Sequence, residues 1–83
     1  MKFKEHLKNK ILQLCGEKNL SVNKLAILSG LTQSTVASIL AGKSNSPRIG
    51  TLHRLAKGFD VDFIDFIKYI YEDGLEFDDD GQP

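Results

Sequence analysis

The sequence predicts an all-α protein in which five short helices form one domain. Apolar residues recur at helical spacing in successive stretches, which is typical of helices that bury one face. Residues that begin or end helices, such as serine, threonine, aspartate and glycine, separate these stretches. No stretch alternates apolar and polar residues as a half-buried strand does. The 83 residues, of which 41% are hydrophobic, are enough for one small domain.

The first helix is expected over residues 2 to 14 or 17. Its buried face carries apolar residues at i, i+4, i+7 and i+8, namely Leu7, Ile11, Leu14 and Cys15. We expect Gly16 or Asn19 to lie in the turn that ends this helix, because both residue types are common where helices stop.

The second and third helices are expected over residues 22 to 28 or 29 and over residues 33–40, with a tight turn between them. Gly30 supplies the left-handed backbone conformation that lets the second helix stop. Ser21 and Thr32 are expected to cap the two helices by accepting bonds from exposed backbone N–H groups. Two short helices joined in this way form a helix-turn-helix, in which they meet at a steep angle. Gly42 is expected to end the third helix.

The fourth helix is expected over residues 50–57 and the fifth over residues 63–71. The inner face of the fourth helix, with its two flanking apolar residues, comprises Ile49, Leu52, Leu55, Ala56 and Phe59. Asp62 is a suitable N-cap for the fifth helix.

The fifth helix is apolar on more than one face, which implies a second buried contact beyond the core. The simplest contact is self-association, for which the candidate residues are Phe63, Phe66, Ile67, Ile70 and Tyr71. Residues 1–71 thus form the predicted folded domain. Residues 72–83 form an acidic tail that we expect to be mostly disordered.

Charge is strongly segregated along the chain, although the net charge is zero. Residues 1–58 carry ten lysines and arginines against only Glu5 and Glu17. Residues 59–83 carry Lys68 against nine aspartates and glutamates. This asymmetry indicates a basic body that meets a polyanion and an acidic end that does not.

The outward face of the third helix is polar but uncharged, unlike an ordinary solvated helix face. Its side chains are those of Gln33, Ser34, Thr35, Ala37 and Ser38. Such a face suits hydrogen bonding to base edges, and glutamine can pair with adenine in two places. The loop that follows contains Lys43, Ser44, Asn45, Ser46, Pro47 and Arg48. Its cations and small donors suit phosphate oxygens, and a plain surface loop is the alternative.

Enzyme, metal and cofactor chemistry find little support, so we expect a non-enzymatic protein without a cofactor or a metal. His6 and His53 lie far apart, and no cysteine, histidine and aspartate residues have metal-ligand spacing. We expect His6 on the surface, His53 exposed on the fourth helix and Cys15 in the core. No apolar run is long enough for a membrane span, and the charged N-terminus does not resemble a signal peptide, so we expect a cytoplasmic protein.

These residues give the chain a family resemblance over about residues 7–67. It resembles the Xre/Cro/phage-repressor-like helix-turn-helix family of DNA-binding proteins of bacteria and phage. The matching segments follow the family's order and spacing: Leu20-Ser21, Lys24-Leu25-Ala26, residues 29–36, residues 39–43, Ser46-Pro47, Thr51-Leu52, Leu55-Ala56-Lys57, Val61 and Phe63. The chain departs from the pattern at Val22, where many relatives carry glutamine, at Ala41, where glutamate is common, and at Asp60, where glycine is usual.

The resemblance implies a compact five-helix, lambda-repressor-like DNA-binding domain with the helix-turn-helix in helices 2 and 3. It implies a sequence-specific, repressor-like transcriptional regulator that binds double-stranded DNA, commonly as a homodimer on a palindromic operator. The implied base contacts come from the start of the third helix: Gln33, Ser34, Thr35 and Ser38. The implied phosphate contacts are Ser21, Asn23, Thr32, Lys43, Ser44, Asn45 and Arg48.

A protein-binding role is the alternative, because a fold alone does not fix a function. The domain would then serve as a protein–protein interaction module or an antitoxin-like binder. The acidic tail offers a surface for a basic protein partner, or for folding back over the basic DNA-binding face.

Overall fold

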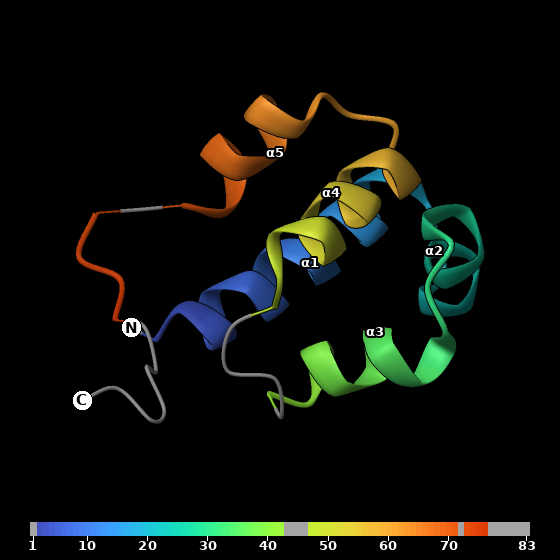
Figure 1. Ribbon diagram of the computed structural model, residues 1–83, viewed down its shortest axis with the longest axis horizontal. Coiled ribbons are helices and arrows are strands. Elements are labelled where there is room, and N and C mark those ends of the chain that lie inside the picture. The colour runs from blue at the N-terminus through green and yellow to red at the C-terminus, as the bar shows by residue number, and fades with distance from the viewer. Residues whose placement is uncertain (1, 43–46, 72, 77–83) are drawn as a thin grey trace.

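The computed structural model describes residues 2–42, 47–71 and 73–76 and contains five helices and no strand in these ranges (Figure 1). The helices are α1 (Phe3–Lys18), α2 (Val22–Ser29), α3 (Gln33–Leu40), α4 (Ile49–Gly58) and α5 (Phe63–Ile70). The predicted all-α fold is therefore confirmed, and the bounds of α2 and α3 match the expected ones. No helix of the described ranges is long and apolar enough to cross a membrane.

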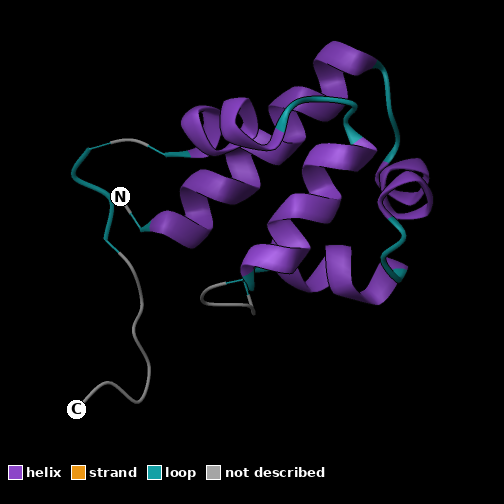
Figure 2. Cartoon of the chain, turned by 45° about the horizontal axis from the view of Figure 1, so that its top comes forward, coloured by secondary structure: helices purple, strands orange, loops and turns teal. Residues whose placement is uncertain are grey.

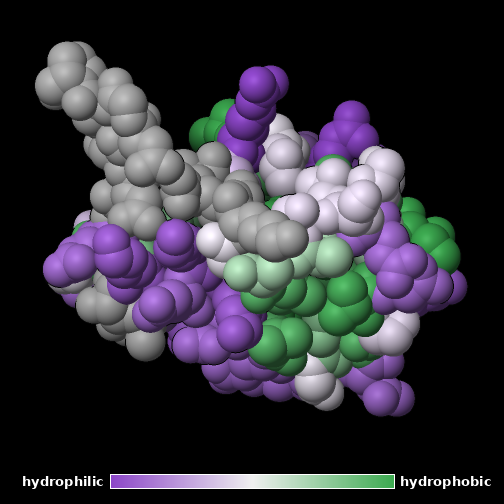
Figure 3. All heavy atoms as spheres, turned by 90° about the horizontal axis from the view of Figure 1, so that it is seen from below, coloured by the Kyte–Doolittle hydropathy of each residue, from purple (hydrophilic) through white to green (hydrophobic). Residues whose placement is uncertain are grey.

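Helix α4 lies between α2 and α5 in the helical body (Figures 1 and 2). It packs against α2 on one side and α5 on the other, while α1 contacts α3 and α5. Helix α2 also packs on α3, and α3 runs along one edge of the molecule. Figure 3 views the molecule from that edge.

Side-chain caps start three of the helices where the sequence predicts them. Ser21 Oγ and Thr32 Oγ1 each accept a hydrogen bond, at 3.1 Å, from the backbone N–H group three residues later. Asp62 Oδ1 accepts one at 2.9 Å from the N–H group two residues later. These bonds satisfy donors at the helix starts that would otherwise lack a partner.

Helices α1 to α4 are each followed by a residue with left-handed backbone, whereas α5 ends at Tyr71 in extended backbone. Gly30 and Gly42 have φ of 68° and 72°, and Asp60 takes the usual glycine position with φ of 60°. Of the two residues expected to end α1, Asn19 is the one in the left-handed conformation, with φ of 56°, and the helix runs through Gly16.

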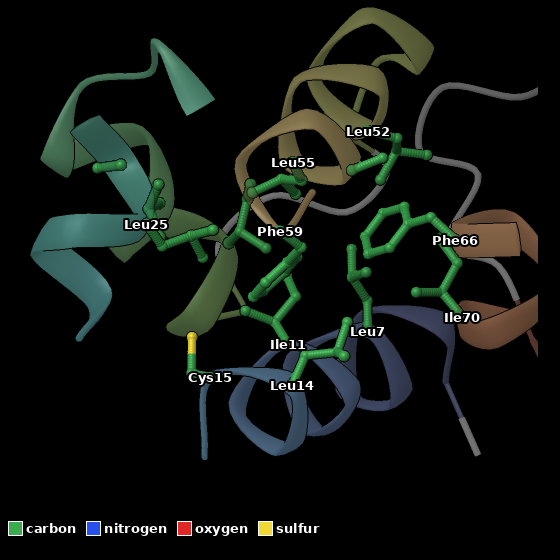
Figure 4. Packing of buried hydrophobic residues seen from close by; sticks show 14 of the residues in the cluster. Leu7, Ile11, Leu14, Cys15, Leu25, Leu52, Leu55, Phe59, Phe66 and Ile70 are labelled. Carbon is green, nitrogen blue, oxygen red and sulfur yellow. The ribbon is translucent and has the colours of Figure 1, made fainter. Parts of the chain in front are cut away.

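The core lies between the helices and receives side chains from all of them (Figure 4). Leu7 and Ile11 of α1 point toward Phe59, which follows α4, and Phe66 of α5 points to the same cluster. The remaining large buried side chains include those of Leu14, Leu25, Val36, Ile39, Leu52, Leu55 and Ile70. The predicted inner faces of α1 and α4 are thus confirmed.

Ile49 is a correction, because we expected it to pack inward beside α4. It is instead the first residue of α4 and is 71% exposed. Helix α4 thus begins one residue earlier than predicted, and its buried residues start one turn later, at Leu52.

Helix α5 requires a second correction, which concerns the expected self-association surface. Phe66 and Ile70 are 1% and 2% exposed and point into the monomer core (Figure 4). They are not available to a second copy. Phe63 and Ile67 are half-buried, and Tyr71 lies exposed just after the helix.

His6 is a third correction, because it is buried rather than on the surface. It lies three residues after the buried Phe3 and next to Leu7, so it widens the inner face of α1. Its Nε2 atom has no hydrogen-bond partner among the described residues. His53 is exposed and Cys15 is buried, as expected.

The start of the acidic tail, residues 73–76, packs on the domain. The backbone N–H of Phe3 donates to the Glu76 carbonyl oxygen at 2.7 Å, and Leu75 is half-buried against the core. This contact supplies a partner at the start of α1, which has no side-chain cap. For residues 72 and 77–83, the expectation of disorder falls outside the described part of the chain.

Candidate nucleic-acid interface

The turn between α2 and α3 is closed by backbone bonds and held from outside by α4. Gly30 N donates to the Ile27 carbonyl at 3.1 Å, and Leu31 N donates to the Ala26 carbonyl at 3.0 Å. Arg54 Nη1 of α4 donates to the Gly30 carbonyl oxygen at 3.0 Å. This guanidinium bond fixes the turn relative to α4. No local sequence pattern indicates this bond, because only the fold brings together two residues that are 24 positions apart.

Helices α2 and α4 approach each other closely at their C-terminal ends, and this contact fixes the position of α2 on α4. Ser29 is buried near the end of α2 and faces Gly58 at the end of α4. A Cβ atom on Gly58 would lie 3.1 Å from both the Cβ and the backbone nitrogen of Ser29, and closer still to Oγ. The structure shows that α2 can sit this close to α4 because this position has no side chain.

Helix α3 turns its polar side chains to solvent and its apolar side chains to the core. Val36 and Ile39 are buried, whereas Gln33, Ser34 and Ala37 are exposed and Ser38 is half-buried. This arrangement follows from the i, i+3 spacing of the apolar pair on an eight-residue helix. The face predicted to meet bases is therefore open rather than packed inside the monomer.

Thr35 takes part in the cap of α3. Its backbone N–H donates to Thr32 Oγ1 at 3.1 Å, and the hydroxyl oxygens of the two threonines lie 2.9 Å apart. The two side chains thus hold each other at the start of the helix. The Thr35 side chain is half-buried, which leaves it less open than Gln33 or Ser34.

The residues predicted to meet phosphate lie at the starts of three helices. Ser21 and Asn23 are exposed at the start of α2, and Thr32 is exposed at the start of α3. Arg48 is exposed at the N-cap of α4, where it makes no side-chain cap bond. The other predicted phosphate residues, Lys43, Ser44 and Asn45, lie outside the described residues.

The sequence around this surface is basic throughout. No aspartate or glutamate occurs between Glu17 and Asp60, a stretch that includes α2, α3 and α4. The described cations of that stretch are exposed: Lys18, Lys24, Arg48, Arg54 and Lys57. Figure 3 shows weakly hydrophilic side chains beside an apolar area on the α3 edge, with strongly hydrophilic residues around them. The described charged side chains between residues 18 and 59, which include α2, α3 and α4, are thus all positive.

The described residues offer no metal centre. No group of three or more histidine, cysteine, aspartate or glutamate side chains in ranges 2–42, 47–71 and 73–76 is placed to hold an ion. Burial raises the pKa of the Cys15 thiol, because the thiolate would lose its hydration. Cys15 therefore stays protonated as a core side chain.

Comparison with solved structures finds the same fold in two proteins. One is an HTH_3 family transcriptional regulator from Vibrio cholerae, which is 32% identical with a TM-score of 0.69. The match covers 80% of this chain but 36% of that one, so the chain spans about a third of the regulator. The other is a point mutant of a restriction-modification controller protein, 20% identical with a TM-score of 0.72, matched over 82% of this chain and 87% of that one.

No curated protein matches the sequence. A family model does match, and it extends over residues 10–72, which include the end of α1 and all of α2 to α5. This range contains the capped helix-turn-helix and the basic stretch described above. The chain belongs to the family of Cro/C1-type HTH DNA-binding domains.

Proposed function

We propose that the chain is a sequence-specific, repressor-like transcriptional regulator that inserts α3 into the major groove of double-stranded DNA. The observation that carries this proposal is the outward face of α3, which is polar, uncharged and open to solvent. Amide and hydroxyl groups match the donors and acceptors of base edges. The α2–α3 turn, held by Arg54, gives this face a fixed orientation.

Base contacts come from the first half of α3, because a recognition helix reads bases with its N-terminal residues. Gln33 makes the leading contact, since its amide can donate to and accept from adenine. Ser34 and Ser38 make weaker contacts. Thr35 is partly held by the cap and contributes through its methyl group.

Backbone contacts come from groups at the helix starts and from the loop after α3. The Ser21 and Thr32 hydroxyls accept cap bonds, and a hydroxyl that accepts a bond can also donate its proton to a phosphate oxygen. Asn23 and Arg48 donate from the starts of α2 and α4. Lys43, Ser44 and Asn45 supply the loop contacts.

The protein acts as a homodimer on a palindromic operator, with α5 at the interface. Ile64, which is 59% exposed, and Tyr71 present apolar surface that the monomer does not cover. The half-buried Phe63 and Ile67 extend it. Two-fold symmetry would place the half-sites about one DNA turn apart, roughly 34 Å.

Selection of bound sequences from a pool of random duplexes tests the proposal. The parent protein should enrich a palindrome, and Gln33→Ala should lose preference at one base pair per half-site, by about 1–3 kcal/mol. Gln13→Ala is the matched control, because Gln13 is an exposed glutamine on α1 that bonds to Glu17. If Gln33→Ala selects the same sequences as the parent with the same discrimination, the base-reading assignment is wrong.

A protein-binding role is the second candidate, and exposed apolar residues on α2 favour it. Ile27 and Leu28 are exposed near the end of α2 and border a hollow that Arg54 and Lys57 also line. A partner with acidic and apolar side chains would fit this surface. Failure of the protein to bind random duplex even at low salt would favour this role over DNA binding.

A further inference from the structure

The C-terminal segment is anchored beside the start of α1. The Glu76 carbonyl accepts the backbone bond from Phe3, and Lys2 and Glu76 form a parallel bridge pair. Leu75 packs against the core. Glu76, the last described residue, therefore lies next to the first turn of α1, and residues 77–83 follow it in the sequence.

A groove lies close to that point, between the first turns of α1 and the end of α3. It has a volume of about 270 Å³ and is lined by Lys4, Glu5, Lys8, Leu40, Ala41 and Gly42. Lys4 and Lys8 are one helical turn apart, so their side chains lie on the same face of α1. The α3 side of the groove leads directly into the loop that carries Lys43.

The tail is long enough to span the distance along the axis of α1 from Phe3 to Lys8. Extended chain spans at most about 3.3–3.6 Å per residue, and a helix rises about 1.5 Å per residue. Asp78 follows Glu76 by two residues, which gives it a reach of roughly 7 Å, and Asp80 reaches twice as far. Lys8 lies five residues along α1 from Phe3, or roughly 7–8 Å along the axis. The tail carboxylates can therefore reach both lysines.

The charges of the two parts are complementary. Residues 77–83 contain Asp78, Asp79 and Asp80 and no lysine or arginine. The groove offers Lys4 and Lys8 against one acid, Glu5, and Lys8 is exposed. Leu40 provides an apolar wall against which Phe77, the one aromatic residue of the tail, can pack.

We propose that the carboxylates of Asp78, Asp79 and Asp80 occupy this groove and compete with the DNA backbone for the end of α3. The contact is intramolecular and electrostatic, so it weakens DNA binding at low salt and fades as salt rises. The competition rests on the proposed DNA-binding function, whereas the tail contact itself does not.

The first experiment tests the contact on the full chain without DNA. Zero-length carbodiimide coupling followed by peptide mapping should join Lys4 or Lys8 to one of the three aspartates in a species of monomer mass. Lys8→Gln should lower the yield at least 2-fold, while Lys68→Gln, at an exposed position on α5, should leave it unchanged. Absence of these links, or links only in species of twice the mass, would overturn the proposal.

The second experiment measures affinity for random duplex at about 50 mM salt, a concentration at which exposed charges interact over more than 10 Å. Changing Asp78, Asp79 and Asp80 to asparagine should tighten binding about 3- to 10-fold, as the loss of two exposed ion pairs with Lys4 and Lys8 predicts. A chain that stops after Glu76 should gain as much, because the anchor to Phe3 is kept. Unchanged affinity alongside the cross-link would overturn the competition. If neither form binds duplex, the proposed function fails while the cross-link still decides the contact.

Discussion

Helices α3 and α5 differ in what their outward faces offer, although each has eight residues and an N-cap side chain. Helix α3 presents amide and hydroxyl groups, with one alanine among them. Helix α5 presents the apolar side chain of Ile64 beside the half-buried Phe63 and Ile67. Binding at the α3 face lowers the free energy when hydrogen bonds to a ligand replace those to water. Binding at the α5 face lowers the free energy when its apolar surface is removed from water. Two eight-residue helices of one domain are thus suited to two different kinds of partner.

The largest expected effect comes from the inner face of α5, which is buried in the core, whereas the outer face is exposed. Phe66→Ala removes a buried ring and should lower the free energy of unfolding by about 3–5 kcal/mol. Ile64→Ala on the exposed face should change it by less than about 0.5 kcal/mol. Urea denaturation of both variants measures the difference. Equal losses would mean that α5 does not have the two distinct faces that we describe.

The next largest effect concerns α4. This helix packs directly on α5, and it packs on α2, which in turn packs on α3. Gly58→Ala should lower the free energy of unfolding by about 1–3 kcal/mol, because its methyl group would overlap Ser29 and push α2 away. Gly16→Ala is the matched control, since a Cβ there meets open space within a helix. That change should raise stability by about 0.5–1 kcal/mol. Thermal unfolding should therefore show shifts of opposite sign for the two glycines.

Self-association tests the outer face of α5 directly. Ile64→Asp should weaken the proposed dimer by about 1–2 kcal/mol, because a carboxylate would lose its hydration in an apolar contact. Ile27→Asp, at an exposed isoleucine on α2, should leave the dimer unchanged. Sedimentation equilibrium measures both constants. A protein that is strictly monomeric with and without DNA would rule out the dimer interface.

Local chemistry made much of this fold predictable from the sequence. The caps Ser21, Thr32 and Asp62, and the left-handed turns, depend on residues within four positions of one another. The burial of His6 does not follow from the predicted apolar stripe of α1, which begins at Leu7. Phe3 is also buried, and it extends the stripe so that His6 lies at its edge. The expected dimer surface included Phe66 and Ile70 because helical spacing alone cannot say which of two apolar faces meets the core. Arg54 and Gly58 act on residues more than 20 positions away, and no local pattern reports such contacts.

The smallest expected effect comes from the N-cap side chains of α3 and α5. Their removal tests whether the two caps contribute equally to stability and to DNA affinity. Thr32→Ala and Asp62→Ala should each lower the free energy of unfolding by about 1 kcal/mol, since each leaves a helix N–H group without its side-chain partner. Thr32→Ser and Asp62→Asn keep an acceptor oxygen and should retain most of the stability. The two caps should differ in DNA affinity, because the cap of α3 also positions Gln33 and can donate to phosphate. A loss of affinity for Asp62→Ala as large as that for Thr32→Ala, measured where both variants are folded, would contradict the separate roles of the two helices.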